Sequence, residues 1–379
     1  MKYVSWKAAC ALACTSALPL LASAQSSSVT LYGVVDLGVA RTSAGGVGSV
    51  TGVSNGGYAT SRLGFRGRED LGGGWAAGFV LEGSLNPDTG TGRSTNTNNQ
   101  ASGAVATTSL TFDRQSYVSL SGPVGEFRLG HDFAPTHWNN IYFDPFNQNG
   151  VARAGNLTFS AVGSGALYTT IVVSNSISYW LPKDLGGLYG MAMVAFGENG
   201  SGSAQKNDGN LMGGRLGFAR GAFDIAGGIT RTRYAKTPTL GNYTHANLGA
   251  TYNLGFAKLF ALYNQAEVQL ATGKVRKRTY ELGAHIPVTA QGKVRLSYAM
   301  LNDDSSASLL NADGSARSSN DARQLGIGYV HDLSKRTALY ASYGHIRNRG
   351  QASYFVNGGS APLAGRNSSG AEFGIRHLF

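Results

Sequence analysis

Residues 277–303, with the sequence KRTYELGAHIPVTAQGKVRLSYAMLND, decide the fold class. Tyr280, Leu282, Ala284, Ile286 and Val288 occupy every second position, and smaller or polar residues stand between them. After a short turn, the same alternation continues to the end of the stretch. Successive side chains of a strand point to opposite faces, so the pattern predicts an antiparallel hairpin with one apolar and one polar face.

Alternation of this kind recurs along the chain and predicts sixteen strands, with boundaries good to about three residues. The predicted strands lie near residues 29–41, 61–69, 74–86, 113–121, 124–132, 174–183, 187–198, 208–219, 222–235, 242–254, 257–268, 277–288, 292–303, 322–333, 337–348 and 369–379. Short and long connections alternate strictly between them, as expected of a transmembrane barrel with turns at one end and loops at the other.

Composition supports a β-protein and excludes several other classes. The 379 residues include 54 Gly but only 9 Pro, and charged residues make up 14%. Collagen is excluded because the glycines have no period of three. Disorder and a helical bundle are disfavoured, because aromatic residues are plentiful and interior Gly destabilises helices.

The first 24 residues predict a cleaved secretory signal peptide. Lys2 and Lys7 precede an apolar run, and Ala22-Ser23-Ala24 forms a small-residue cleavage site. Both cysteines, Cys10 and Cys14, fall in this segment, so the predicted mature domain, residues 25–379, has no disulfide.

The mature sequence has no run of 18 apolar residues, which leaves an exported soluble protein or a transmembrane β-barrel. The predicted strands are longer than the usual ~5–6 residues, and arginines lie on their polar faces. A lumen filled with water accommodates such a face better than the space between two packed sheets. We therefore expect an all-β, 16-stranded antiparallel transmembrane β-barrel, in which such a strand number leaves an aqueous channel.

Seven motifs, in order, resemble one family along nearly the whole mature chain. They are SSVTLYGVVDLGV (27–39), SRLGFRGREDLGGGW (61–75), RQSYVSLSG (114–122), GEFRLG (125–130), NSISYW (175–180), LSKRTALYASY (333–343) and GIRHLF (374–379). The chain resembles the general trimeric porins of the Gram-negative outer membrane, in their betaproteobacterial branch. This resemblance implies a passive diffusion channel for small hydrophilic solutes. It also implies a homotrimer in contact with outer-membrane lipid and lipopolysaccharide, with the second external loop, residues 87–112, reaching a neighbouring subunit.

The resemblance further implies that the third external loop, residues 133–173, folds into the barrel as a constriction. The aromatic content of this segment independently suggests that it packs on the inner wall. Arg62, Arg66 and Arg68 are expected on one inward face. The resemblance also places Arg114, Ser116 and Val118 inward.

Two loop residues complete the predicted constriction. Asp144 is the only acid between residues 133 and 173, and Arg153 adds a positive charge. A ring dominated by arginine attracts anions, so we expect anion preference.

The end of the chain has a separate predicted role. Phe373, Ile375, His377 and Phe379 share one face of the last strand. In the family, such an end looks like the signal that the outer-membrane assembly machinery recognises.

Other functions are less well supported. A substrate-selective anion or saccharide channel is the main alternative, and it should carry a row of aromatic residues along the lumen, which the sequence does not reveal. An outer-membrane enzyme or adhesin is a weaker alternative. His131, Asp132 and His137 have no clean metal-ligand spacing, so we expect no metal and no cofactor. Nucleic acid is disfavoured as a partner because the net charge of +11 is spread along the strands.

Overall fold

The structure is a computed structural model that describes residues 27–106, 109–159 and 168–379. The predicted signal peptide, residues 1–24, lies outside the described residues. Within these ranges, eighteen strands form one antiparallel sheet, and the sheet closes into a barrel where the last strand pairs with the first. No helix of the described residues is both long and apolar enough to cross a membrane.

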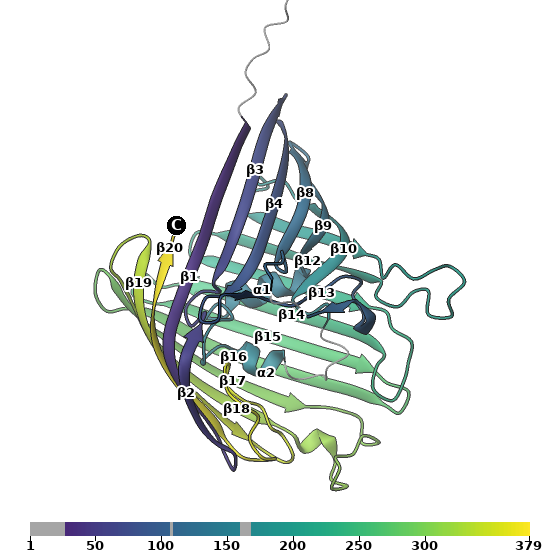
Figure 1. The fold of residues 1–379 in the computed structure, drawn as a ribbon, viewed down its shortest axis with the longest axis vertical. Coiled ribbons are helices and arrows are strands. Elements are labelled where there is room, and N and C mark those ends of the chain that lie inside the picture. The colour runs from purple at the N-terminus through teal and green to yellow at the C-terminus, as the bar shows by residue number, and fades with distance from the viewer. Residues whose placement is uncertain (1–26, 107–108, 160–167) are drawn as a thin grey trace, which may run out of the picture.

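Sixteen of these strands form the barrel wall, as predicted (Figure 1). They are β1 (Ser27–Ala44), β3 (Arg62–Gly72), β4 (Trp75–Asn86), β8 (Gln115–Gly122), β9 (Gly125–Phe133), β10 (Val172–Trp180), β11 (Leu188–Ala195), β12 (Leu211–Arg220), β13 (Phe223–Thr232), β14 (Asn242–Asn253), β15 (Lys258–Gln269), β16 (Lys274–Pro287), β17 (Gly292–Asp303), β18 (Ala322–Asp332), β19 (Thr337–Asn348) and β20 (Ser368–Leu378). Each predicted boundary lies within about three residues of the observed one.

The alternation predicted from sequence places apolar side chains on the outer wall. Along β18, the outward Leu325, Ile327 and Tyr329 are exposed, whereas the residues between them are buried. Exposed valines, leucines and aromatics recur around the ring, which is the reverse of a soluble protein with its apolar residues inside.

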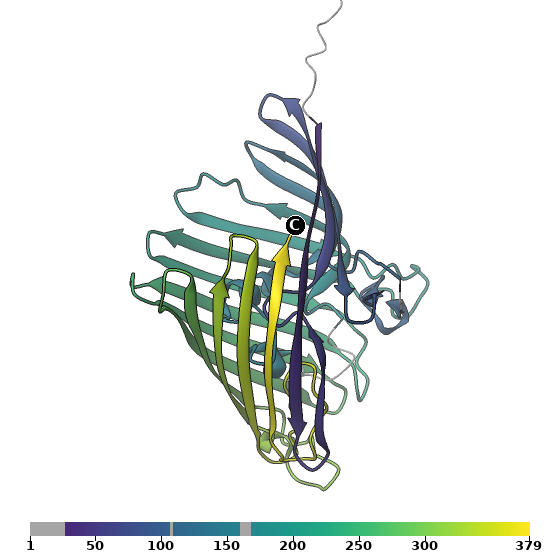
Figure 2. The same ribbon diagram turned by 60° about the vertical axis from the view of Figure 1, so that its left-hand side comes forward.

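Closure of the barrel depends on β1, which has partners on both sides. Residues Val34–Ala44 pair with β20, while Ser27–Val34 pair with β3. On the edge that pairs with β3, residues Leu37–Ala44 of β1 pair with β2 (Gly48–Asn55). The two strands form a hairpin, which Figure 2 shows. None of the strands predicted from the sequence covers these residues, so β2 is a missed element.

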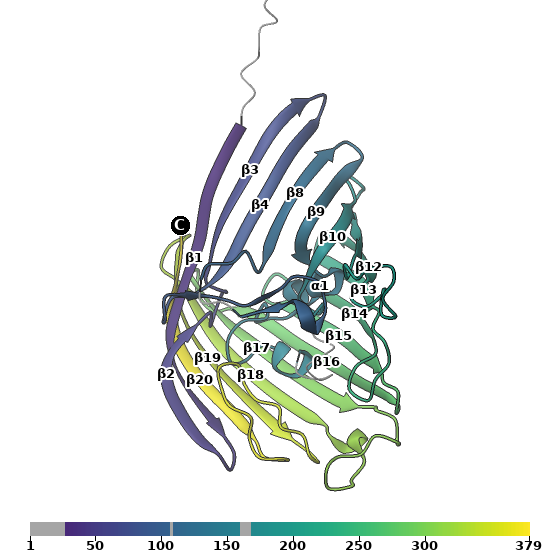
Figure 3. The ribbon, with the colours of Figure 1, turned by 45° about the vertical axis from the view of Figure 1, so that its right-hand side comes forward.

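The connection between β9 and β10 enters the barrel, as predicted (Figure 3). It contains the helices α1 (Pro135–Phe143) and α2 (Gly155–Thr158). α1 packs on β11–β15 and α2 on β16 and β17. We call residues 134–171 the inner loop, of which residues 160–167 lie outside the described ranges.

Small residues on the inner wall make room for the inner loop. A Cβ atom at Gly249 would lie 2.2 Å from Phe143, and one at Gly283 would lie 2.2 Å from Pro145. Both distances are far shorter than a van der Waals contact, so these positions admit no larger side chain unless the loop moves.

The second external loop, residues 87–112, contains β5 (Thr91–Gly92), β6 (Thr95–Asn96), the 3-10 helix η1 (Ala101–Gly103) and β7 (Ala104–Val105). A further 3-10 helix, η3 (Arg317–Ser319), lies between β17 and β18. Asn99 exchanges two hydrogen bonds of 2.9 Å with the backbone of Ser174, and Gln100 donates to the carbonyl of Gly197 at 2.8 Å. These contacts hold residues 99–100 on the loop's own barrel, and the expectation that the segment reaches a neighbouring subunit stays a prediction.

Candidate functional site

Two spaces lie along the barrel axis. The loop-side space has a volume of about 1040 Å³. It lies between the inner loop, the second external loop, and the start of β3, the end of β4 and the start of β8. The turn-side space, of about 960 Å³, lies nearer the short turns. Arginines dominate the charged lining of both spaces. The loop-side set is Arg62, Arg93, Arg114, Arg153, Arg376, Glu82 and Asp113, and the turn-side set is Arg66, Arg68, Arg128, Lys183, Arg215, Glu126 and Asp184.

Arg62 and Arg114 share one carboxylate in the loop-side space. The Nε atom of Arg114 lies 2.5 Å from one oxygen of Glu82, and the Nε atom of Arg62 lies 3.2 Å from the other. The hydroxyl of Tyr32 also donates to Glu82, at 3.0 Å. Glu82 therefore holds the two guanidinium groups close together, where two positive charges face one negative charge.

The second external loop adds Arg93 to this group. Its Nε atom donates to Asn86 at 3.1 Å, and burial lowers its pKa, an effect that Asp113 opposes. Burial also raises the pKa of Asp113, whose carboxylate accepts the backbone N–H of Ser84 at 2.6 Å. An arginine stays protonated in proteins, whereas a carboxyl group with a raised pKa loses charge more readily, so the lining remains cationic.

Arg153 lines the loop-side space from the inner loop. Burial, reinforced by the charge of Arg93, lowers its pKa to about 10, which leaves it cationic at neutral pH. Gln324 of β18 donates to the carbonyls of Ala152 and Arg153, each at 2.9 Å. Glu372 of β20 accepts the N–H of Val151 at 2.9 Å. The barrel wall thus fixes the backbone that carries Arg153.

Asp144 does not line either space, and the structure does not support it as the acid opposing the arginines. Its side chain is 0% exposed, and its carboxylate accepts the N–H groups of Phe146 and Gln148 at 2.8 and 2.9 Å. Burial raises the pKa of Asp144, and hydrogen bonds with the N–H groups of Phe146 and Gln148 and with Glu281 of the wall oppose this rise. Asp144 therefore shapes the inner loop, and Glu82 and Asp113 are the acids of the loop-side space.

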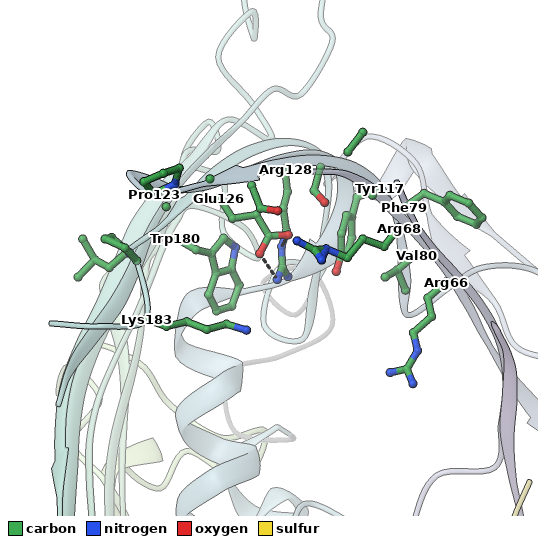
Figure 4. A pocket seen from close by; sticks show the side chains of 18 of the residues that line it. Arg66, Arg68, Phe79, Val80, Tyr117, Pro123, Glu126, Arg128, Trp180 and Lys183 are labelled. Carbon is green, nitrogen blue, oxygen red and sulfur yellow. Dashed lines mark hydrogen bonds and ion pairs between the residues drawn. The ribbon is translucent and has the colours of Figure 1, made fainter. Parts of the chain in front are cut away.

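Arg66 and Arg68 lie at a different level from Arg62, in the turn-side space shown in Figure 4. Arg66 and Lys183 point into this space from opposite walls. Arg128 lies between two aromatic rings, with its Cζ atom 4.6 Å from the centroid of Tyr117 and 4.3 Å from that of Trp180. The carboxylates of Glu126 and Asp132 pair with Arg128, which offsets its charge. The predicted arginine ring is therefore two successive groups.

The inward phase of β8 differs from the prediction. Arg114 precedes the strand and faces the loop-side space, but Tyr117 and Ser119 line the turn-side space. Val118 is 54% exposed on the outer wall. The expectation that Ser116 and Val118 point inward with Arg114 is therefore wrong, because the strand begins after Arg114.

The last strand presents the predicted face. The outer wall exposes all four of these side chains, which are Phe373, Ile375, His377 and Phe379. Glu372, on the opposite face of the strand, is buried. The backbone N–H of Phe379 donates to the carbonyl of Gly33 at 3.1 Å, and the reverse bond has the same length.

The three histidine and aspartate residues considered for metal binding have other contacts. His131 contacts the hydroxyl of Ser174 at 2.8 Å and the carbonyl of Asp113 at 3.0 Å. Asp132 binds Arg128, and His137 packs against Phe133. Burial lowers the pKa of His137 to about 3, so it is neutral at physiological pH. In the part of the chain that the structure describes, no three His, Cys, Asp or Glu residues form a metal-binding group.

Sequence reasoning missed several charged residues of the two spaces, among them Glu82, Arg93 and Arg128. Glu82 and Arg128 carried a usable signal, since each is a charged residue on the polar face of a predicted strand. Arg93 carried none, because its position inside the barrel mouth depends on the fold of the second external loop.

The profile of the Gram-negative porin family matches residues 8–351. The chain belongs to this family. This porin is 36% identical to outer membrane porin protein 32 of Delftia acidovorans over 361 residues, which cover 93% of this chain and 94% of the relative. It is a passive channel in the outer membrane of a Gram-negative bacterium, and its relatives are channels rather than enzymes.

Comparison with solved structures also gives matches to barrels of this kind. The anion-selective porin from Comamonas acidovorans superimposes on this porin with a TM-score of 0.80 and 35% identity, covering 93% of this chain and 100% of that one. The trimer form of OmpT from Vibrio cholerae has a TM-score of 0.61 at 14% identity, covering 93% and 100%, which shows a shared fold alone.

Proposed function

We propose that this porin favours anions over cations, with the loop-side space as the selective constriction. The main support for this proposal is the charge of the lining, which contains five arginines and two acids. Glu82 is shared between Arg62 and Arg114, and the raised pKa of Asp113 weakens the second acid. The low-dielectric wall concentrates this positive field on the narrow aqueous path. The anion selectivity named for the Comamonas relative supports the same direction.

The zero-current potential of the purified protein in a planar bilayer tests the proposal. Under a KCl gradient, we expect the sign of a chloride-selective pore, and the opposite sign would refute anion preference. The double variant Arg62→Gln/Arg114→Gln should lower the chloride-to-potassium permeability ratio roughly two- to fivefold. An unchanged ratio would remove these two residues from the selective group.

Ionic strength gives an independent measurement on the unaltered protein. The Debye length falls from ~8 Å at 0.15 M salt to ~3 Å at 1 M. Selectivity that comes from charged walls should therefore weaken as the mean KCl concentration rises. Selectivity that stays constant would point instead to a tight binding site for the ion.

The assembly we propose is a homotrimer embedded in outer-membrane lipid and lipopolysaccharide. The trimer form of a fold relative supports the oligomer, and the broad apolar outer wall supplies surface for both lipid and neighbouring subunits. Chemical cross-linking in mild detergent should end at three chains, and a monodisperse monomer would contradict the trimer.

Two terminal segments complete the proposal. Residues 1–24 direct export and are removed, so N-terminal sequencing of the membrane form should begin at Gln25. The face made by Phe373, Ile375, His377 and Phe379 is recognised by the outer-membrane assembly machinery. Phe379→Ala should reduce the amount of assembled protein, whereas Phe256→Ala, at an exposed position in a turn, serves as the matched control.

A further inference from the structure

The helix α1 has one polar, buried face and one apolar face. Asn139 donates to Asn247 of the wall at 2.9 Å, and Asn247 donates to the carbonyl of Thr136 at 2.8 Å. These bonds fix α1 against β14. On the other side of the helix, Trp138 packs in part against a buried cluster that includes Val173 of β10 and Met191 of β11.

The opposite face consists of Trp138, Ile141 and Tyr142. Trp138 and Ile141 line the loop-side space. The rings of Trp138 and Tyr142, one helical turn apart, stack at 5.8 Å with an interplanar angle of 16°. Tyr142 is 49% exposed although its helix lies inside the barrel, so its ring meets the water of the lumen. We call these three residues the apolar face of α1.

Aromatic contacts extend this face toward the turn-side space. Trp138 meets Trp180 edge-on at 5.7 Å, and Trp180 lines the turn-side space. The guanidinium of Arg215 lies 5.6 Å from the ring of Tyr142 and 4.9 Å from that of Tyr189. Aromatic surface thus accompanies both groups of arginines along the pore axis.

The same loop-side space therefore presents an apolar aromatic surface and a cationic surface. Arg62, Arg93 and Arg114 supply the cationic side. A solute that matches both surfaces carries a negative charge at one end and a flat apolar body at the other.

We propose that aromatic carboxylates are the organic anions that this pore binds best during passage. The carboxylate pairs with the arginines while the ring lies against the apolar face of α1. This inference rests on the proposed anion preference and names the solute class within it. The inference also favours a pore that binds some solutes selectively. The sequence alone had revealed no row of aromatic residues to suggest such selectivity.

The choice of an aromatic body over an aliphatic one follows from ring geometry. A flat ring stacks on Trp138 or Tyr142 with an attraction beyond its buried area, whereas a puckered ring of similar size gains the area alone. Since aromatic pairs contribute about 0.5–1.5 kcal/mol beyond burial, we expect binding to differ by about two- to tenfold.

Two acids of matched charge and similar size test the inference on the unaltered trimer. In a planar bilayer in dilute KCl, we would measure how benzoate and cyclohexanecarboxylate reduce the chloride current. We expect half-reduction at about two- to tenfold lower benzoate concentration. Equal potency of the two acids would overturn the inference. Benzyl alcohol should reduce the current far less than benzoate, and equal reduction would also overturn it, because the charge would then play no part.

Variants localise the effect. Trp138→Leu and Tyr142→Leu should each bring the benzoate and cyclohexanecarboxylate values together. Tyr252→Leu, on the outer wall, is the matched control and should keep the wild-type difference. A full difference in both inner-loop variants would overturn the assignment to α1. If an inner-loop variant fails to assemble, the comparison of the two acids on the wild-type pore still decides the inference.

The zero-current potential in KCl separates this inference from the proposed function. A cation-selective wild-type pore would refute the proposed anion preference itself. An anion-selective pore that treats the two acids alike would leave that preference intact and refute the aromatic class alone.

Discussion

The Oε1 atom of Glu82 lies 2.5 Å from the Nε atom of Arg114, at the mouth of the constriction. The side chain of Glu82 is largely buried and also pairs with Arg62, so it both orients the two arginines and reduces their field. A single acid thereby moderates the charge on a wall that is otherwise strongly cationic.

Replacement of that acid should strengthen selectivity. Glu82→Gln keeps the size of the side chain and its hydrogen-bonding oxygen but removes the negative charge. We expect the chloride-to-potassium permeability ratio to rise roughly two- to fivefold in a KCl gradient. Glu69→Gln, on the outward phase of the same hairpin, is the control and should change little. A fall in the ratio for Glu82→Gln would show that Glu82 acts chiefly by orienting the arginines.

Loss of the bond between β18 and the inner loop should make the constriction unsteady. Gln324→Leu removes the amide that donates to the carbonyls of Ala152 and Arg153 and accepts from Asn156. With Arg153 less well fixed, we expect greater open-channel current noise and a weaker anion preference. Single-channel recording measures both quantities. Gln265→Leu, on the outward face of β15, should record like the wild type; a quiet Gln324→Leu pore would mean that Glu372 suffices as an anchor.

The buried carboxylate of Asp36 predicts an effect on stability. Asp36 is fully buried and accepts the hydroxyl of Tyr340 at 2.7 Å and the N–H of Tyr58 at 2.9 Å. Tyr340→Phe removes one donor and should lower the free energy of unfolding by about 1–3 kcal/mol. The temperature at which the folded band disappears in detergent gels reports the change. Tyr343→Phe, an exposed tyrosine on the same strand, should leave that temperature unchanged.

Acidification should increase anion preference through Asp113. Burial raises the pKa of this carboxyl, so its negative charge is lost as the pH falls through the raised value. The zero-current potential should then shift toward the chloride value between neutral and acidic pH. Asp113→Asn should already show more of this shift at neutral pH and a smaller pH response. His137 should not contribute above about pH 4, because its pKa lies at about 3.

The barrel was predictable because one face of every strand meets an apolar environment and the other meets water. That difference imposes a period of two, and the pattern survives even where individual residues are ambiguous. β2 escaped prediction because its hairpin projects beyond the barrel, with most of Gly48–Asn55 exposed on both faces. Nothing then forces its side chains to alternate.

The site was predictable only in part, on strands as well as on loops. Arg62 follows from strand phase and faces the pore as expected. Asp144 was misjudged because its charge was counted without its surroundings, which are backbone N–H groups and the buried Glu281. The aromatic content of the inner loop predicted packing, but not that Trp138 and Tyr142 would turn toward the lumen, since this depends on which face of α1 binds the wall.

The pairing of β1 with β20 joins the earliest and the latest parts of the fold. Ring closure must await the arrival of β20, so a translation product that stops short leaves the edge of β1 open to other strands or to proteases. Contacts this distant in sequence also form slowly. We therefore expect that only a polypeptide that includes β20 closes the barrel and resists degradation.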